Sequence, residues 1–94
     1  MDPEEIADAY AREGDVHAAA KRYEEAVVLY DRAIEVFPEC NEAWTGKAAA
    51  LRLAGKLQAA LECVEAALQT WPSPETELLR DSLVDEMRQK GMLR

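Results

Sequence analysis

Glycine, proline and histidine are scarce in this sequence. The 94 residues include four glycines, four prolines and one histidine, whereas 49% of the residues are hydrophobic and 32% are charged. This composition is typical of a folded, helix-rich protein, because few residues break helices and enough apolar side chains are present to form a core. We expect one small domain over residues 1–94, so a two-domain enzyme is excluded.

Basic residues are outnumbered by acidic ones. Eleven Lys and Arg residues stand against nineteen Asp and Glu residues, which gives a net charge of −8. Because this charge repels phosphate backbones and anionic lipids, we expect no nucleic-acid or membrane partner and a mild preference for basic protein partners. The first residues, MDPEEIADAY, lack the basic and apolar regions of a signal peptide, and no apolar run is long enough to span a membrane. A cytoplasmic location is therefore expected.

Residues that could carry chemistry are few and isolated. Cys40 and Cys63 belong to no CxxC or Cys/His cluster, so we expect reduced thiols rather than metal ligands or a disulfide. His17 falls at a helical position where a core side chain is expected, while Ser73 and Ser82 are explained as an N-cap and a helix residue. With no nucleophile beside a base and no metal-ligand spacing, the sequence predicts no enzyme activity, no metal and no cofactor.

The sequence repeats with a period of 34 residues. A shift of this length aligns alanines, aromatic residues and a proline with their own kind, so that Ala9, Tyr10, Ala20, Ala26, Ala33, Phe37 and Pro38 fall on Ala43, Trp44, Ala54, Ala60, Ala67, Trp71 and Pro72. A repeat of this length is typical of a supersecondary unit that stacks on its neighbours.

Each unit is expected to contain two amphipathic helices. Apolar side chains recur at helical spacing in residues 23–37 and 57–71, and Pro38 and Pro72 end both helices because proline lacks a backbone donor. Gly55 suits the turn between the helices of the second unit, since glycine tolerates left-handed backbone angles.

Helix signals also flank the two ends of the chain. Asp2 and Pro3 predict an N-cap and a first helical residue, and Ser73 and Pro74 predict the same for a fifth helix that stops near Gly91. An apolar stripe on this last helix predicts that it covers a core. The sequence therefore predicts an all-α fold of five helices.

The unit resembles the tetratricopeptide repeat (TPR). The resemblance rests on an aromatic, small and alanine pattern that ends in proline: Tyr10, Gly14, His17, Ala26, Tyr30, Ala33 and Pro38 in the first unit, and Trp44, Ala48, Leu51, Ala60, Val64, Ala67 and Pro72 in the second. It implies a right-handed solenoid of antiparallel helix hairpins, with repeats at about 5–38 and 41–72 and a capping helix at 73–90. Departures from the family pattern are Glu13 and Lys47 in place of a leucine and Lys21 in place of a turn glycine.

The resemblance also implies a protein-binding scaffold or adaptor whose concave groove holds a peptide or partner helix. The groove-facing positions would be Asp8, Ala11, Arg12, Asp15 and Ala19 on the first helix, and Glu42, Thr45, Gly46, Ala49, Arg52 and Leu53 on the third. Small residues there would let a ligand backbone approach closely, and Gly46 is interpreted as a groove residue that packing does not explain. The alternative is that these positions form a solvated helix face.

Some TPR domains are co-chaperones that bind a terminal carboxylate through basic and amide side chains of the groove. Here the corresponding positions hold Ala11, Asp15, Gly46 and Glu42, so the donors for such a carboxylate clamp are missing or reversed in charge. A second hypothesis is structural: the ends of the stack or the fifth helix mediate self-association into a homo-oligomer or docking within a larger assembly. The sequence is consistent with a complete chain and with a segment of a longer array.

Overall fold

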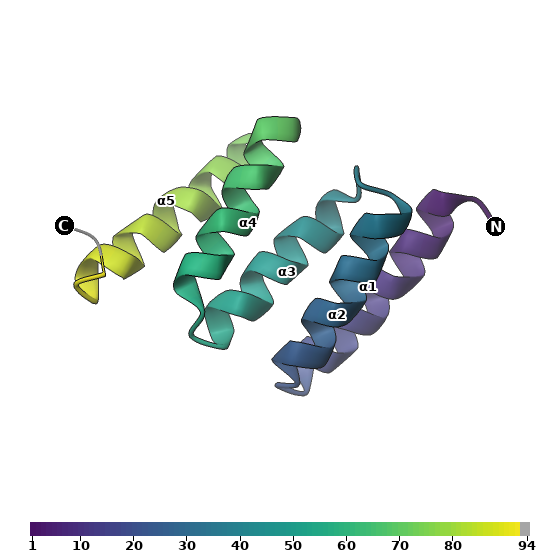
Figure 1. Cartoon of the computed structure of the whole chain (residues 1–94), viewed down its shortest axis with the longest axis horizontal. Helices are drawn as coiled ribbons and strands as arrows, with labels where there is room; N and C mark the ends of the chain where they lie inside the picture. The colour runs from purple at the N-terminus through teal and green to yellow at the C-terminus, as the bar shows by residue number, and fades with distance from the viewer. Residues whose placement is uncertain (93–94) are drawn as a thin grey trace.

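Five α-helices follow one another along residues 1–92, the part of the chain that the computed structural model describes. Their bounds are α1 Pro3–Ala19, α2 Tyr23–Val36, α3 Asn41–Leu53, α4 Leu57–Thr70 and α5 Pro74–Gln89. No strand occurs in these residues, so the prediction of an all-α fold with five helices is confirmed. The helices stack along an axis to give a flat, elongated body of 46 × 29 × 16 Å (Figure 1).

Side-chain caps start the first and last helices as predicted. The Asp2 carboxylate accepts a hydrogen bond of 2.9 Å from the Glu5 amide, and the Ser73 hydroxyl accepts one of 3.2 Å from the Thr76 amide. Each cap is followed by a proline at the first helical position, where the missing amide costs nothing. Both helix starts are therefore determined by local sequence.

The turns inside the two hairpins have the same backbone geometry. Gly55 has a φ of +82°, and Lys21, which lies 34 residues earlier, has a φ of +64°. In both turns the amide of the next residue donates back into the preceding helix, from Arg22 to the His17 carbonyl at 2.9 Å and from Lys56 to the Leu51 carbonyl at 2.8 Å. The first hairpin thus uses a left-handed lysine where the second uses glycine.

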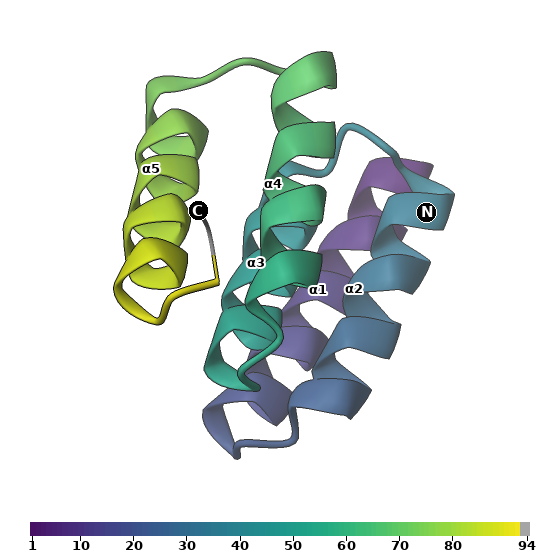
Figure 2. The ribbon, with the colours of Figure 1, turned by 60° about the vertical axis from the view of Figure 1, so that its left-hand side comes forward.

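Successive helices pack side by side in the order of the chain. In Figure 1, α2 lies in front of α1 and α4 in front of α5, with α3 between the two pairs. Figure 2 shows the same stack from the side, with α5 at the end opposite α1 and α2. In addition, α1 contacts α3 directly. Residues far apart in the sequence can therefore share one face of the stack.

Two hydrophobic clusters hold the stack together. The N-terminal core joins α1, α2 and α3 through Ala7, Ala11, Ala26, Tyr30, Ala33, Cys40, Ala43 and Ala50. The C-terminal core joins α3, α4 and α5 through Ala48, Leu51, Leu57, Ala60, Leu61, Cys63, Val64, Leu83 and Met87. Because α3 contributes to both clusters, it links the two hairpins, and α5 covers the second cluster as predicted.

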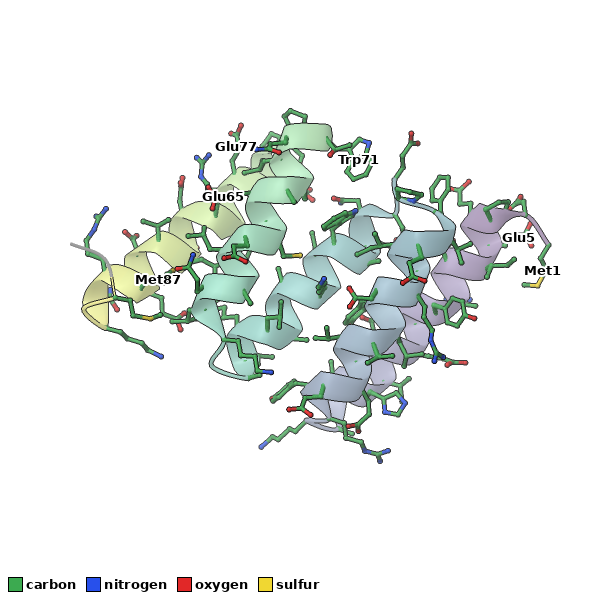
Figure 3. The ribbon with its side chains drawn as sticks, viewed as in Figure 1. Met1, Glu5, Glu65, Trp71, Glu77 and Met87 are labelled. Carbon is green, nitrogen blue, oxygen red and sulfur yellow. The ribbon has the colours of Figure 1, made fainter. Side chains whose placement is uncertain are left out.

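Two tryptophans lie at the edge of the stack where α3 begins and α4 ends. The Trp44 indole donates a 2.8 Å hydrogen bond to the Pro38 carbonyl, and its ring centroid lies 6.2 Å from that of Trp71. Trp71 points from the end of α4 towards the start of α3 (Figure 3). These contacts fix the connection between α2 and α3.

Candidate functional site

The predicted groove residues lie on α1 and α3, two helices that contact each other. Asp8, Arg12 and Asp15 recur on α1 at spacings of four and three residues, which places them on one side of that helix. On α3 the corresponding positions are Glu42, Thr45, Gly46, Ala49 and Arg52. We call the surface that these positions form together with α5 the α1–α3–α5 face.

Asp8 and Glu42 meet at one end of this face. They line a hollow of about 210 Å³ together with Glu4, Phe37, Glu39, Cys40 and Asn41. Four acidic residues from α1, α3 and the connection before α3 therefore line the same hollow as one aromatic residue. The hollow is too small for a drug-sized ligand but wide enough for one side chain of a partner.

The expectation that Ala11 lines the groove surface is wrong. Only 2% of Ala11 is exposed, and the residue packs in the N-terminal core with Ala7 and Ala26. This cluster includes residues of α2 and α3, so Ala11 faces the interior and offers no surface to a ligand.

The interpretation that packing does not explain Gly46 is also wrong. A Cβ atom added to Gly46 would lie 2.6 Å from Cε1 of Tyr30, and one added to Gly14 would lie 2.7 Å from the same atom. The Tyr30 ring therefore occupies the space between α1 and α3 that the two glycines leave open. Gly46 is needed for the close packing of an aromatic ring, whether or not a ligand approaches it.

Tyr30 is a residue that the sequence did not single out for the site. It is 1% exposed, yet its hydroxyl passes between the helices and donates a 2.5 Å hydrogen bond to Oδ1 of Asp15. Burial, and then the hydrogen bond and negative charge of Asp15, raise the pKa of Tyr30, so the phenol remains a donor. This hydrogen bond holds the Asp15 carboxylate in one orientation. The only available signal was a tyrosine at a position where the second unit has Val64.

Two other candidates make their polar contacts within the protein. The Thr45 hydroxyl lies 3.0 Å from the Asn41 carbonyl oxygen and 3.2 Å from that of Glu42, inside its own helix. Nε of Arg52 donates to Oε1 of Glu86 on α5 at 2.8 Å. Glu86 therefore offsets the charge of Arg52. Arg12 is the other basic residue among the predicted groove positions. Ala49 is exposed and makes no polar side-chain contact.

The remaining side chains give little support for catalysis. Burial raises the pKa of the Cys63 thiol to about 11 and also raises the pKa of Cys40, so neither thiol is activated as a nucleophile. Both cysteines are free and buried. His17 is half-buried, and its Nδ1 atom has no hydrogen-bond partner. Within residues 1–92, no three His, Cys, Asp or Glu side chains are arranged to hold a metal ion.

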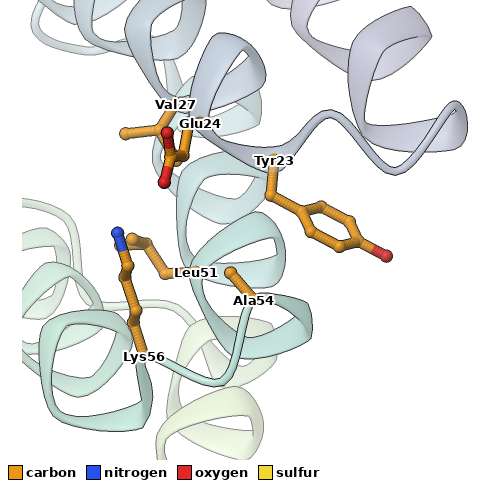
Figure 4. Close-up of a pocket in the computed structure, with 6 residues that line it drawn as sticks. All are labelled: Tyr23, Glu24, Val27, Leu51, Ala54 and Lys56. Atoms are coloured by element: carbon orange, nitrogen blue, oxygen red, sulfur yellow. The ribbon is translucent and has the colours of Figure 1, made fainter.

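A second hollow lies between the start of α2 and the turn after α3. Its volume is about 170 Å³, and Figure 4 shows its lining of Tyr23, Glu24, Val27, Leu51, Ala54 and Lys56. None of the predicted groove residues lines it, and it contains no histidine, cysteine or serine. It is smaller than a typical small-molecule site.

Comparison with known proteins places the chain in a family. A family model described as tetratricopeptide repeat matches residues 5–73, which is most of the chain. No curated protein matches the sequence. None of the helices in the described part of the chain is long and apolar enough to cross a membrane. The match covers both hairpins, and the helical-hairpin solenoid that the resemblance to the tetratricopeptide repeat implies is therefore confirmed. Proteins of this family generally serve as protein interaction modules or scaffolds, and this chain belongs to the tetratricopeptide repeat family.

Proposed function

We propose that the α1–α3–α5 face binds a basic peptide or a partner helix, and that its anchor is a lysine or arginine side chain of that ligand. The observation that carries this proposal is the hollow where Asp8 and Glu42 meet beside Phe37. A long basic side chain can lay its apolar stem along the ring and place its charged head among the carboxylates.

The charge of the face supports the same class of ligand. Arg52 forms an ion pair with Glu86 at 2.8 Å, whereas Asp8, Asp15 and Glu42 form no ion pair with a basic side chain of residues 1–92. Asp15 accepts a hydrogen bond at one carboxylate oxygen from Tyr30, which leaves the other oxygen for a ligand. A terminal carboxylate would meet Asp8, Asp15 and Glu42 against Arg12 on this face, so a carboxylate clamp is not proposed.

NMR titration of the full chain with an arginine-rich peptide tests the proposal. We expect the largest shifts at residues of α1 and α3, and binding that weakens as salt is added, because the contacts are between exposed charges. A peptide of the same length with glutamate in place of arginine should not bind.

A pair of charge-matched variants makes the test specific. Asp8→Asn with Glu42→Gln should weaken binding about two- to five-fold for each carboxylate removed, as for exposed ion pairs. Glu62→Gln with Glu65→Gln removes the same charge from exposed positions on α4 and should leave the affinity unchanged. Equal losses in both double variants would show that only net charge matters, and shifts confined to α2 and α4 would refute the binding face.

The cytoplasmic location, the absence of nucleic-acid and membrane partners, and the absence of enzyme activity stay predictions. They rest on the net charge of −8 and on the lack of paired catalytic residues.

A further inference from the structure

The two hairpins differ in what covers their first helix. On α3, Ala43 is fully buried and Ala50 is 1% exposed, because both pack against the preceding hairpin in the N-terminal core. A shift of 34 residues places Ala9 and Val16 of α1 at these positions. Ala9 is exposed and Val16 is 68% exposed, so the same helix surface is covered in one repeat and uncovered in the other.

A charged position lies between these apolar residues in both helices. On α3 it is Lys47, whose ammonium lies 2.6 Å from the Asp31 carboxylate of the covering hairpin. On α1 the equivalent residue is Glu13, which is exposed. The charge is therefore reversed, and a hairpin packed on α1 would need a basic residue where α2 has Asp31.

Ala9, Glu13 and Val16 define the outer face of α1. We propose that this face docks a helical hairpin of a basic partner, packed as α1 and α2 pack on α3, with a lysine or arginine opposite Glu13. Ala9 allows the close helix approach that Ala43 allows in the second repeat. The proposal concerns a different surface from the hollow beside Phe37 and does not depend on it.

A neighbouring position restricts the partner further. Gly46 leaves room for the Tyr30 ring, but the residue 34 positions earlier is Arg12, which carries a long side chain instead of a hydrogen atom. A tyrosine cannot pack there in the same way. The partner hairpin therefore carries an aliphatic or smaller residue next to its basic one.

A second copy of this chain fits the outer face poorly. Figure 1 places α5 at the opposite end of the stack from α1 and α2, and α5 exposes Asp81 and Asp85. Stacking copies end to end would bring these carboxylates towards Glu13, between two chains that each carry a net charge of −8. Charge complementarity favours a basic partner over self-association.

The outer face can be tested by adding a hairpin of known packing to the full chain. A copy of residues 39–72 inserted before Glu5 keeps the 34-residue period and places Val64 and Glu65 of the copy where Tyr30 and Asp31 lie. Four proteins combine Glu65 or Glu65→Lys in the copy with Glu13 or Glu13→Lys in the chain. We expect both proteins with opposite charges to have a Tm about 1–4 °C above both proteins with like charges.

The rate of thiol labelling measures directly whether the outer face of α1 is covered. Val16→Cys should react rapidly in the unextended chain and slowly after addition of the hairpin with Glu65→Lys, provided that both cysteines of the added copy are replaced by alanine. The buried Cys40 and Cys63 of the original chain serve as internal controls. Equal Tm values across the four proteins, or equal labelling rates, would overturn the proposal. So would sedimentation of the unextended chain as a dimer that Glu13→Lys dissociates, because the face would then belong to a second copy.

Discussion

At the scale of single residues, the packing around Tyr30 connects the core to the candidate site. Its ring lies between Gly14 and Gly46, and its hydroxyl bonds to Asp15. The glycines of two helices and a tyrosine of a third thus form one arrangement. A change at any of these residues is expected to affect both the spacing of α1 and α3 and the position of a carboxylate on their common face.

Gly46→Ala is expected to destabilise the protein by about 1–3 kcal/mol, although alanine is the better helix former by about 1 kcal/mol. The reason is that the new Cβ would lie 2.6 Å from the Tyr30 ring. Urea unfolding measures the loss. Tyr30→Val, which places the residue of the second unit at this position, should make Gly46→Ala neutral or stabilising in the double variant. A stabilising effect of Gly46→Ala in the presence of Tyr30 would contradict the packing argument.

The buried thiols predict a loss of stability at alkaline pH. Burial raises the pKa of Cys63 from 9.0 to about 11, so above pH 9 the folded state retains a proton that the unfolded state releases. The free energy of unfolding should therefore fall as the pH rises from 9 to 11. Urea unfolding at pH 8.5 and 10.5 should show a smaller decrease for Cys63→Ala than for the unmodified chain, and an identical decrease would refute the assignment to this thiol.

At the scale of helices and turns, the two hairpins form turns of the same geometry from different residues. Gly55 adopts a φ of +82° at no steric cost, whereas Lys21 adopts +64° with a side chain that disfavours it. The hydrogen bonds of the two turns are equivalent, so the backbone geometry is set by the hairpin rather than by the residue.

Lys21→Gly is therefore expected to stabilise the protein, by about 0.5–1 kcal/mol after the entropy that glycine gains in the unfolded chain is counted. Thermal unfolding followed by circular dichroism should show a higher Tm. Arg22→Gly, at the next residue, where φ is −93°, is the matched control and should lower the Tm. If both changes lowered the Tm equally, backbone strain at Lys21 would not be the cause.

At the scale of the whole molecule, stability depends on how each end of the stack is covered. The C-terminal core is closed by α5, whose Leu83 and Met87 are fully buried. Arg52 on α3 and Glu86 on α5 join the same two helices at the surface. At the other end, α1 leaves Val16 uncovered, which makes the two ends of the molecule unequal.

Leu83→Ala should cost about 2–5 kcal/mol, because it removes a fully buried side chain and leaves a cavity between α5 and the rest of the stack. Leu78→Ala is the matched control on the same helix, since Leu78 is 67% exposed, and should cost about 0.5 kcal/mol or less. Chemical denaturation of the two variants checks the difference. Similar values would mean that α5 does not close the core.

The sequence by itself determined the number of helices, the 34-residue period, the caps at Asp2 and Ser73 and the turn at Gly55. These features depend on neighbouring residues and on apolar spacing within one helix, which can be read along the chain. Helical spacing together with the resemblance to the tetratricopeptide repeat also predicted groove positions at Asp8 and Glu42, which line one hollow in the structure.

Only the tertiary structure decided which of the predicted groove side chains are exposed and which are buried or paired within the protein. Ala11 is buried, Gly46 receives the Tyr30 ring, and Arg52 is paired with Glu86 on another helix. Each outcome depends on a contact between residues 15 to 34 positions apart, and helical spacing alone does not specify which residue of a neighbouring helix lies opposite. Helical spacing and the resemblance therefore indicated sides of α1 and α3, and packing between helices determined which residues there are exposed.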